Sequence, residues 1–80
     1  MYYTYVLKSI EFDYHYIGLT SNLEKRLGEH NSGKTQSNKH YKPFQLIYFE
    51  EAETRDIARK REKYLKSAAG RRYLQKKLAP

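Results

Sequence analysis

The first part of the chain holds two short apolar stretches of strand-forming residues, separated by polar ones. Residues 3–8 and 14–19 are rich in aromatic and branched residues, and the polar break at 11–13 separates them. Such a pattern predicts an antiparallel hairpin. Because every second side chain of a strand lies on the same face, Tyr5 and Tyr16 can both project to one side of the sheet.

The next stretch has the period of a helix. The tetrapeptide at 21–24 has Ser first and Glu last. This is a capping-box pattern, in which the serine satisfies a first-turn amide, so we expect a helix to begin there. Leu23 and Leu27, one turn apart, give the helix an apolar stripe, and an Asn-Ser-Gly sequence ends it near residue 31. Gly28 inside the helix costs about 1 kcal/mol relative to alanine, so either a close approach or simple tolerance explains it.

A loop and two further elements follow. Residues 34–43 are polar and basic without periodicity and predict an exposed loop, whereas residues 44–49 are apolar at nearly every position. The apolar run predicts a third strand that is central in the sheet or covered on both faces. Thr54 is the expected N-cap of a second helix that extends to about Ser67. The residues spaced to face the core from that helix are Ile57, Ala58, Tyr64 and Leu65.

The C-terminal part predicts one more short helix. The Ala-Gly pair at 69–70 breaks the helical pattern, and residues 71–78 resume it with Tyr73 and Leu74 as packing residues. Three strands are the minimum for an independent sheet, and 80 residues suffice for one small core. We therefore expect an α+β fold, a single domain over residues 1–80 in which a small three-stranded antiparallel β-sheet is flanked by helices.

Composition narrows the class of protein. The chain contains no Cys, which excludes disulfides and Cys-based zinc sites, and nine Tyr must supply much of the aromatic volume of the core. No apolar run approaches the roughly 20 residues needed to span a bilayer, and the N-terminus lacks the pattern of a signal peptide. We expect a soluble, cytoplasmic protein with no membrane partner.

The distribution of charge is more informative than the net charge of +7. Residues 1–54 hold six Lys or Arg against seven Asp or Glu, whereas residues 55–80 hold ten against two. A polyanion partner such as DNA is indicated, because neutralising phosphates releases condensed counterions. A solvated helix face that only keeps the protein soluble is the alternative. The cations expected to contact nucleic acid are Arg59, Lys60, Lys63, Lys66, Arg71 and Arg72, with Lys34 and Lys39 of the loop.

The order of a few residues points to a family. Tyr3-Thr4-Tyr5 lies on the first strand, Tyr16-Ile17-Gly18 on the second, and Arg26 and His30 lie one turn apart on the following helix. This order resembles the GIY-YIG family of DNA-cleaving domains. The likeness extends through the segment 61–72 and is strongest to the small stand-alone bacterial members, which are similar to the N-terminal nuclease domain of the excision repair protein UvrC.

The resemblance implies a role for each of five residues. Tyr16 would act on the attacking water with Tyr5 in support, Arg26 would grip the phosphate with His30 alongside, and Glu62 would hold a single divalent metal, Mg²⁺ or Mn²⁺. Helical spacing agrees with the pairing of Arg26 and His30, because side chains four residues apart share a face. A lone carboxylate completed by waters is a usual way for Mg²⁺ to bind in phosphate chemistry.

Three assignments stay open at this point. An unperturbed phenol has a pKa of about 10, so Tyr16 would need positive charge nearby, and His30, which titrates closer to neutrality, is the competing base. Glu62 is otherwise explained as the i, i+4 partner of Lys66. Asn31 either caps the helix or contacts phosphate, and capping is the safer interpretation.

The activity implied is metal-dependent endonucleolytic cleavage of DNA, with RNA as an alternative substrate and DNA repair or processing as the role. No element is suited to reading base edges, so we expect selection of nucleic-acid structure rather than sequence. The chain has Tyr-Thr where the family name has Gly-Ile, and Leu19 where the UvrC-type domain has a lysine. Lys25, Lys34 and Lys39 are the candidates to replace that cation.

A second function comes from another class of protein. The chain could be a nucleic-acid-binding module that uses its basic C-terminal helices and cleaves weakly or not at all. Salt-dependent affinity carried by residues 55–77 would be its signature. Nothing in the sequence requires more than a monomer.

Overall fold

The computed structural model describes residues 1–79. The elements in chain order are β1 (Tyr2–Ser9), β2 (His15–Thr20), α1 (Leu23–Asn31), the 3₁₀ turn η1 (Lys39–Tyr41), β3 (Phe44–Ala52), α2 (Arg55–Lys66) and α3 (Ala68–Leu78). The strands form one antiparallel sheet in the spatial order β2-β1-β3. The predicted α+β class, with a three-stranded antiparallel sheet flanked by helices, is confirmed. No helix within residues 1–79 is both long and apolar enough to cross a membrane.

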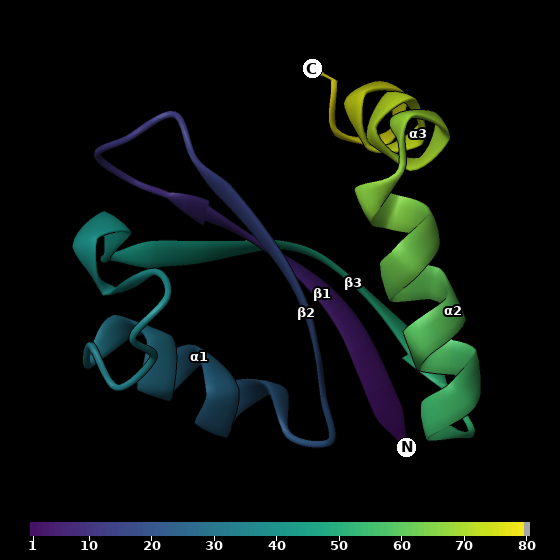
Figure 1. Ribbon diagram of the computed structural model, residues 1–80, viewed down its shortest axis with the longest axis horizontal. Helices are drawn as coiled ribbons and strands as arrows, with labels where there is room; N and C mark the ends of the chain where they lie inside the picture. The colour runs from purple at the N-terminus through teal and green to yellow at the C-terminus, as the bar shows by residue number, and fades with distance from the viewer. Residues whose placement is uncertain (80) are drawn as a thin grey trace.

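The central strand β1 separates two apolar clusters. Tyr5 and Leu7 pack on the face covered by α1, and Val6 packs on the opposite face with Leu65 of α2 and Leu74 of α3. Figure 1 shows this layering, with α1 at the lower left, the sheet in the middle, and α2 and α3 at the right. Because side chains of a strand alternate between faces, one strand supplies both halves of the core.

Strand β3 lies at an edge of the sheet, so a central position is wrong, whereas coverage on both faces is confirmed. The pairing of β1 with β3 shifts between Val6 and Leu7, which leaves Ile47 as the extra residue of a β-bulge. Leu46 packs on the α1 side, while Ile47 and Tyr48 both pack on the α2 side. The bulge therefore produces consecutive apolar residues in an edge strand, a pattern that also fits a central one.

Helix α1 begins one residue later than the capping box predicts. Asn22, not Ser21, is the N-cap, because its side-chain Oδ1 accepts a hydrogen bond from the backbone N–H of Lys25 at 3.1 Å. The helix ends at Asn31, as expected. A Cβ on Gly28 would meet no atom within 4 Å. Simple tolerance, and not a close approach, explains this glycine.

The boundary between α2 and α3 is formed by a serine. Thr54 caps α2 as predicted, accepting from the N–H of Ile57 at 3.2 Å. The helical run breaks at Ser67, not at the Ala-Gly pair, and Ser67 Oγ accepts from the N–H of Gly70 at 3.2 Å. A Cβ on Gly70 would lie 1.9 Å from the carbonyl oxygen of Tyr64. Glycine is thus required for the close contact between the two helices rather than as a helix breaker.

The buried face of α2 differs from the predicted one. Ile57 is 50% exposed and Tyr64 is 37% exposed. Thr4 of β1 donates a hydrogen bond to the carbonyl oxygen of Ala58 at 2.7 Å. The helix therefore contacts the sheet at the small residue Ala58, and Ile57 faces outward. The residues that α2 buries are Ala58, Glu62 and Leu65.

Candidate active site

The two motif tyrosines lie on adjacent strands and point to the same face, as predicted. Tyr5 pairs with Gly18 across the ladder, Leu7 pairs with Tyr16, and the two tyrosine rings are 6.2 Å apart. Tyr5 is 2% exposed and its ring covers Gly18. A Cβ on Gly18 would lie 2.6 Å from Tyr5 Oη and 2.8 Å from Tyr16 Cε2. The glycine of the second motif therefore makes room for both rings.

Helix α1 brings His30 against these rings. Leu23 and Leu27 pack on the core, and the same helical face continues to His30, which is completely buried. His30 Nε2 lies 3.0 Å from Tyr5 Oη, and its ring centroid lies 4.8 Å from that of Tyr16. The expectation that His30 and Arg26 converge on one phosphate is wrong for the imidazole, because His30 lies behind Tyr5 and has no exposed surface.

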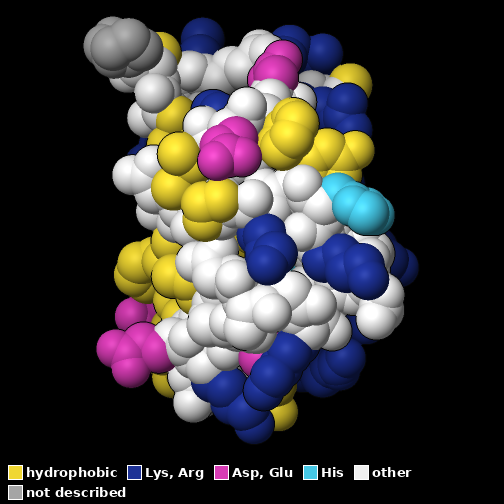
Figure 2. Space-filling view, turned by 90° about the vertical axis from the view of Figure 1, so that its left-hand side faces the viewer, with side chains coloured by type: hydrophobic (Ala, Val, Ile, Leu, Met, Phe, Trp, Pro, Cys, Tyr) yellow, Lys and Arg dark blue, Asp and Glu magenta, His cyan; other side chains and the backbone are white. Residues whose placement is uncertain are grey.

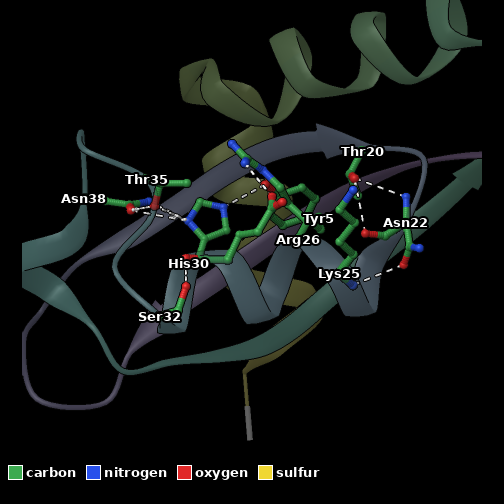
Figure 3. A network of polar contacts seen from close by, with 10 residues as sticks. Tyr5, Thr20, Asn22, Lys25, Arg26, His30, Ser32, Thr35 and Asn38 are labelled. Atoms are coloured by element: carbon green, nitrogen blue, oxygen red, sulfur yellow. Dashed lines mark hydrogen bonds and ion pairs between the residues drawn. The ribbon is translucent and has the colours of Figure 1, made fainter.

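Arg26, one turn earlier on α1, is half-buried beside Tyr5. Its Nη1 donates to Glu29 Oε1 at 3.0 Å, and this ion pair is partly exposed. Figure 3 shows Arg26, His30 and Tyr5 converging where α1 meets the sheet. The guanidinium has five N–H donors in a planar fork, so the bond to Glu29 leaves donors for a phosphate group.

Thr35 and Asn38, two residues of the loop after α1, contact Nδ1 of His30 on the side of the ring away from Tyr5. Neither contact was predicted from the sequence. Asn38 is completely buried, although its segment was predicted as an exposed loop. His30 Nδ1 lies 3.1 Å from Asn38 Nδ2 and 3.1 Å from Thr35 Oγ1, and Thr35 Oγ1 lies 2.6 Å from Asn38 Oδ1. The aperiodic polar stretch carries no sequence signal for this burial, because the loop is folded back onto His30 only by tertiary structure.

Burial controls the ionisation of the site. Desolvation raises the pKa of Tyr5 to about 12, the charges of Tyr16 and Glu62 act in the same direction, and Arg26 opposes them. Desolvation also lowers the pKa of His30; the hydrogen bond with Asn38 opposes this shift, and the charge of Arg26 adds to it. At neutral pH, Tyr5 is therefore a protonated hydrogen-bond donor and His30 is neutral.

Glu62 approaches the site from α2 on the opposite face of the sheet. The residue is 9% exposed. Its Oε1 lies 3.6 Å from Arg59 Nη1 and its Oε2 lies 3.2 Å from Lys66 Nζ, so the expected i, i+4 pair is present. No group of three His, Asp or Glu side chains within residues 1–79 could hold a metal ion. The chain fits a divalent metal only as one carboxylate completed by water, which is acceptable to Mg²⁺.

Two other assignments made from the sequence change with the structure. Asn31 neither caps α1 nor points to a phosphate, because its Oδ1 accepts from the N–H of Phe44 at 2.6 Å and its Nδ2 donates to the carbonyl of Phe44 at 3.2 Å. This tie joins the end of α1 to the start of β3. Leu19 pairs with Thr4 and lies on the α2 face of β2, opposite to Tyr16. Position 19 therefore points away from the two tyrosines.

The predicted nucleic-acid contacts fall on two surfaces. Six lie on α2 and α3, and two lie on the loop after α1. Figure 2 views the face formed by the hairpin turn, η1 and α1, where Lys and Arg side chains gather over the middle and lower parts. The lysines of α1 and the following loop are Lys25, Lys34, Lys39 and Lys42. Cations thus lie on α1 and its following loop as well as on α2 and α3.

A cavity of about 710 Å³ lies away from this chemistry. Val6 and Ile17 of the hairpin and Leu74 and Leu78 of α3 line it, with Arg71 at its rim. None of the five proposed catalytic residues borders it. The candidate site is therefore the cluster of Tyr5, Tyr16 and His30, which lies apart from this cavity.

The protein has a three-stranded sheet with helices on both faces, and two tyrosines of the sheet lie beside the helix that carries Arg26 and His30. This is the arrangement that the resemblance implies for a nuclease catalytic domain. The model of the GIY-YIG catalytic domain matches residues 1–77, and the chain belongs to the GIY-YIG family. The chain is also 38% identical over 76 residues to the UPF0213 protein CPE1444 of Clostridium perfringens, covering 94% of this chain and 81% of that protein. No solved structure matches the chain significantly.

Proposed function

We propose that this protein is a metal-dependent endonuclease that hydrolyses DNA phosphodiester bonds. One observation carries the proposal. Tyr5, Tyr16, Arg26 and His30 come from two strands and a helix, and they form one cluster in which Tyr5 is hydrogen-bonded to His30 and lies beside Arg26. A structural role alone would not call for a cation and three polar rings at one point of a small core.

Each residue of the cluster has a separate role in the proposed reaction. The half-buried Tyr16 first loses its phenol proton to solvent, and the phenolate then accepts a proton from the attacking water. The resulting hydroxide bonds to phosphorus while the bond from phosphorus to the leaving oxygen breaks, and the protonated Tyr5 donates a hydrogen bond to the phosphate. Arg26 binds the same phosphate through its free guanidinium donors and stabilises the added negative charge of the transition state. Glu62 is the residue that would hold Mg²⁺ or Mn²⁺. A bound divalent cation would neutralise charge on the phosphate and leaving oxygen.

Structure selection is part of the proposal. Within residues 1–79, the basic surfaces are the helices α2 and α3 on one face of the sheet and the region of α1 with its following loop on the other, the face of Tyr5. Such surfaces bind phosphates rather than read bases, so branched, nicked or partly single-stranded DNA is the expected substrate. A role in DNA repair or processing is consistent with this choice.

Nicking of supercoiled plasmid and of a branched oligonucleotide tests the proposal. The wild type should nick at low salt with Mg²⁺ or Mn²⁺, and Arg26→Ala and Glu62→Ala should each lose nicking by on the order of 10²-fold or more. The matched control for Glu62→Ala is Glu53→Ala, which removes an exposed charge of the same sign. Equal rates for Glu62→Ala and wild type would refute the metal assignment.

A second function has its own support in the structure. Both carboxylate oxygens of Glu62 are already paired with cations, and the position occupied by Leu19 offers none to the tyrosines. These features suit a nucleic-acid-binding module. Such a module would bind with strong salt dependence, would not cut either substrate, and would lose affinity on removal of Arg71 and Arg72.

A further inference from the structure

The polar groups behind Tyr5 form a single chain of hydrogen bonds. Thr35 Oγ1 and Asn38 Oδ1 are 2.6 Å apart, Asn38 Nδ2 and His30 Nδ1 are 3.1 Å apart, and His30 Nε2 and Tyr5 Oη are 3.0 Å apart. His30 and Asn38 are both completely buried. No buried side-chain nitrogen or oxygen within residues 1–79 lacks a hydrogen-bond partner. Figure 3 shows Thr35 and Asn38 on the side of His30 that faces away from Tyr5.

The first contact fixes the orientation of the Asn38 amide. A separation of 2.6 Å is normal for O–H···O but shorter than the usual range of N–H···O bonds. The atom of Asn38 next to Thr35 is therefore its carbonyl oxygen, and Thr35 donates to it. The amide nitrogen consequently faces His30.

The amide nitrogen in turn fixes the tautomer of His30. Both hydrogens of an Asn amide are donors, so a proton on His30 Nδ1 would face a second donor at 3.1 Å. Thr35 Oγ1 at 3.1 Å and Asn38 Oδ1 at 3.3 Å could accept from such a proton, but the buried amide nitrogen would then lose its acceptor. His30 Nδ1 is therefore the acceptor, and the single proton of the neutral ring lies on Nε2. The hydrogen bond made by one ring nitrogen decides which nitrogen is protonated, as is usual for histidine.

The consequence reaches Tyr5. With its proton on Nε2, His30 donates to Tyr5 Oη, so the phenol proton of Tyr5 is left to point away from His30, on the side of the hydroxyl where the half-buried Arg26 would hold a phosphate. With the opposite tautomer, Tyr5 would donate inward to His30 and could not donate to a phosphate. Burial keeps His30 neutral and Tyr5 protonated, since it lowers the pKa of the former and raises that of the latter.

We propose that Asn38 is a positioning residue for the nuclease reaction, holding His30 in the Nε2–H tautomer and thereby directing the hydroxyl proton of Tyr5 toward the substrate. Thr35 completes the chain by orienting the Asn38 amide. This inference rests on the proposed function, and it adds two residues of the loop after α1 to the machinery that supports the reaction.

The variant Asn38→Asp is the sharpest test, because it is nearly isosteric and reverses one hydrogen bond. A carboxylate has only acceptors, so Nδ1 of His30 must become protonated. The measurement is ¹⁵N NMR of the histidine ring nitrogens in the full chain at neutral pH, assigned with His15→Gln and His40→Gln. We expect Nε2–H in wild type and a protonated Nδ1 in the variant.

Cleavage kinetics supply the second readout. In Asn38→Asp, kcat should fall by on the order of 10²-fold with KM nearly unchanged, because phosphate binding by the lysines and Arg26 is retained. The matched control is Asn31→Asp, which weakens the tie to Phe44 on the same part of the chain without touching His30. It should leave both the His30 tautomer and kcat near their wild-type values.

The outcomes separate the two claims. An Nδ1–H tautomer in the wild type, which needs no variant to fold, would overturn the positioning role. So would a wild-type kcat in Asn38→Asp, while the nuclease function would survive either result. Absence of all cleavage by the wild type would refute the proposed function and the positioning role together, whatever the tautomer.

Discussion

Substitution of Gly18 by alanine tests whether this glycine is required to make room for the rings of Tyr5 and Tyr16. The added methyl group would lie 2.6 Å from Tyr5 Oη and 2.7 Å from Tyr5 Cζ, where ordinary contacts begin at 3.4 Å. One of the two groups must therefore move by about 0.8 Å, the difference between 3.4 and 2.6 Å. Tyr5 is 2% exposed and bonded to His30, so its ring has little free space to move into.

The cost follows from two opposing terms. Overpacking of a tight core typically costs about 1–3 kcal/mol, and displacement of Tyr5 would weaken its bond to His30 by a further amount of about 1 kcal/mol. Replacement of a glycine within a strand regains about 0.5–1 kcal/mol from backbone entropy. We expect Gly18→Ala to lower the free energy of unfolding by about 1–3 kcal/mol, and to reduce cleavage more than this loss of stability accounts for.

Urea unfolding at about 25 °C followed by circular dichroism measures the change, with Gly28→Ala as the matched control. A Cβ on Gly28 meets nothing within 4 Å, so the same substitution there should raise the free energy of unfolding by about 0.5–1 kcal/mol. Opposite signs at the two glycines would support the steric argument. If Gly18→Ala were as stable as Gly28→Ala, the ring of Tyr5 would not be fixed where the structure has it.

Three further predictions concern other parts of the molecule. Arg61 donates to both carboxylate oxygens of Glu50 at 2.7 and 2.8 Å, and the Arg61 side chain is 37% exposed. We therefore expect Arg61→Lys to lower the free energy of unfolding in urea by only about 1 kcal/mol. An unchanged unfolding midpoint would contradict the importance of the bidentate bond. The pKa of His30 is lower in the folded protein than its ordinary value of 6.5. The unfolded chain therefore binds the proton more readily, and stability should be full above about pH 6.5 and fall as the pH drops below it. Thermal unfolding between about pH 5 and 7.5 should show this loss in wild type and in His40→Gln alike, and a flat profile would refute the buried neutral imidazole. Glu62→Met should keep the free energy of unfolding within about 1 kcal/mol of wild type while abolishing nicking, and a loss above about 3 kcal/mol would show a structural role.

Local patterns predicted the elements that depend on local interactions. The hairpin, the Thr54 cap and the shared face of Tyr5 and Tyr16 follow from strand alternation and capping chemistry, both of which act between near neighbours. The choice between Ser21 and Asn22 as N-cap could not be made, since the two residue types cap about equally well.

Features that arise from contacts between distant segments could not be predicted. The position of β3 at the edge depends on how β1 is shared between two partners, and the bulge at Ile47 masks the alternation that would reveal it. Asn38 is buried only because the loop folds back onto His30, and no periodicity marks a single buried amide in a polar loop. The direction of the hydrogen bonds of Asn38 depends on its distances to Thr35 and His30, and the sequence does not contain these distances.

Glu62 is a charged residue on the buried face of α2. It occupies the face of α2 that also buries Ala58 and Leu65, where an apolar side chain would satisfy packing without desolvating a charge. Buried ion pairs are often no more stabilising than apolar residues of similar volume. Its two cationic partners are each about half exposed, so they could remain solvated without it. Stability alone therefore does not account for a carboxylate here, and the proposed nuclease function gives it a second role, as the one protein oxygen that would hold a divalent cation.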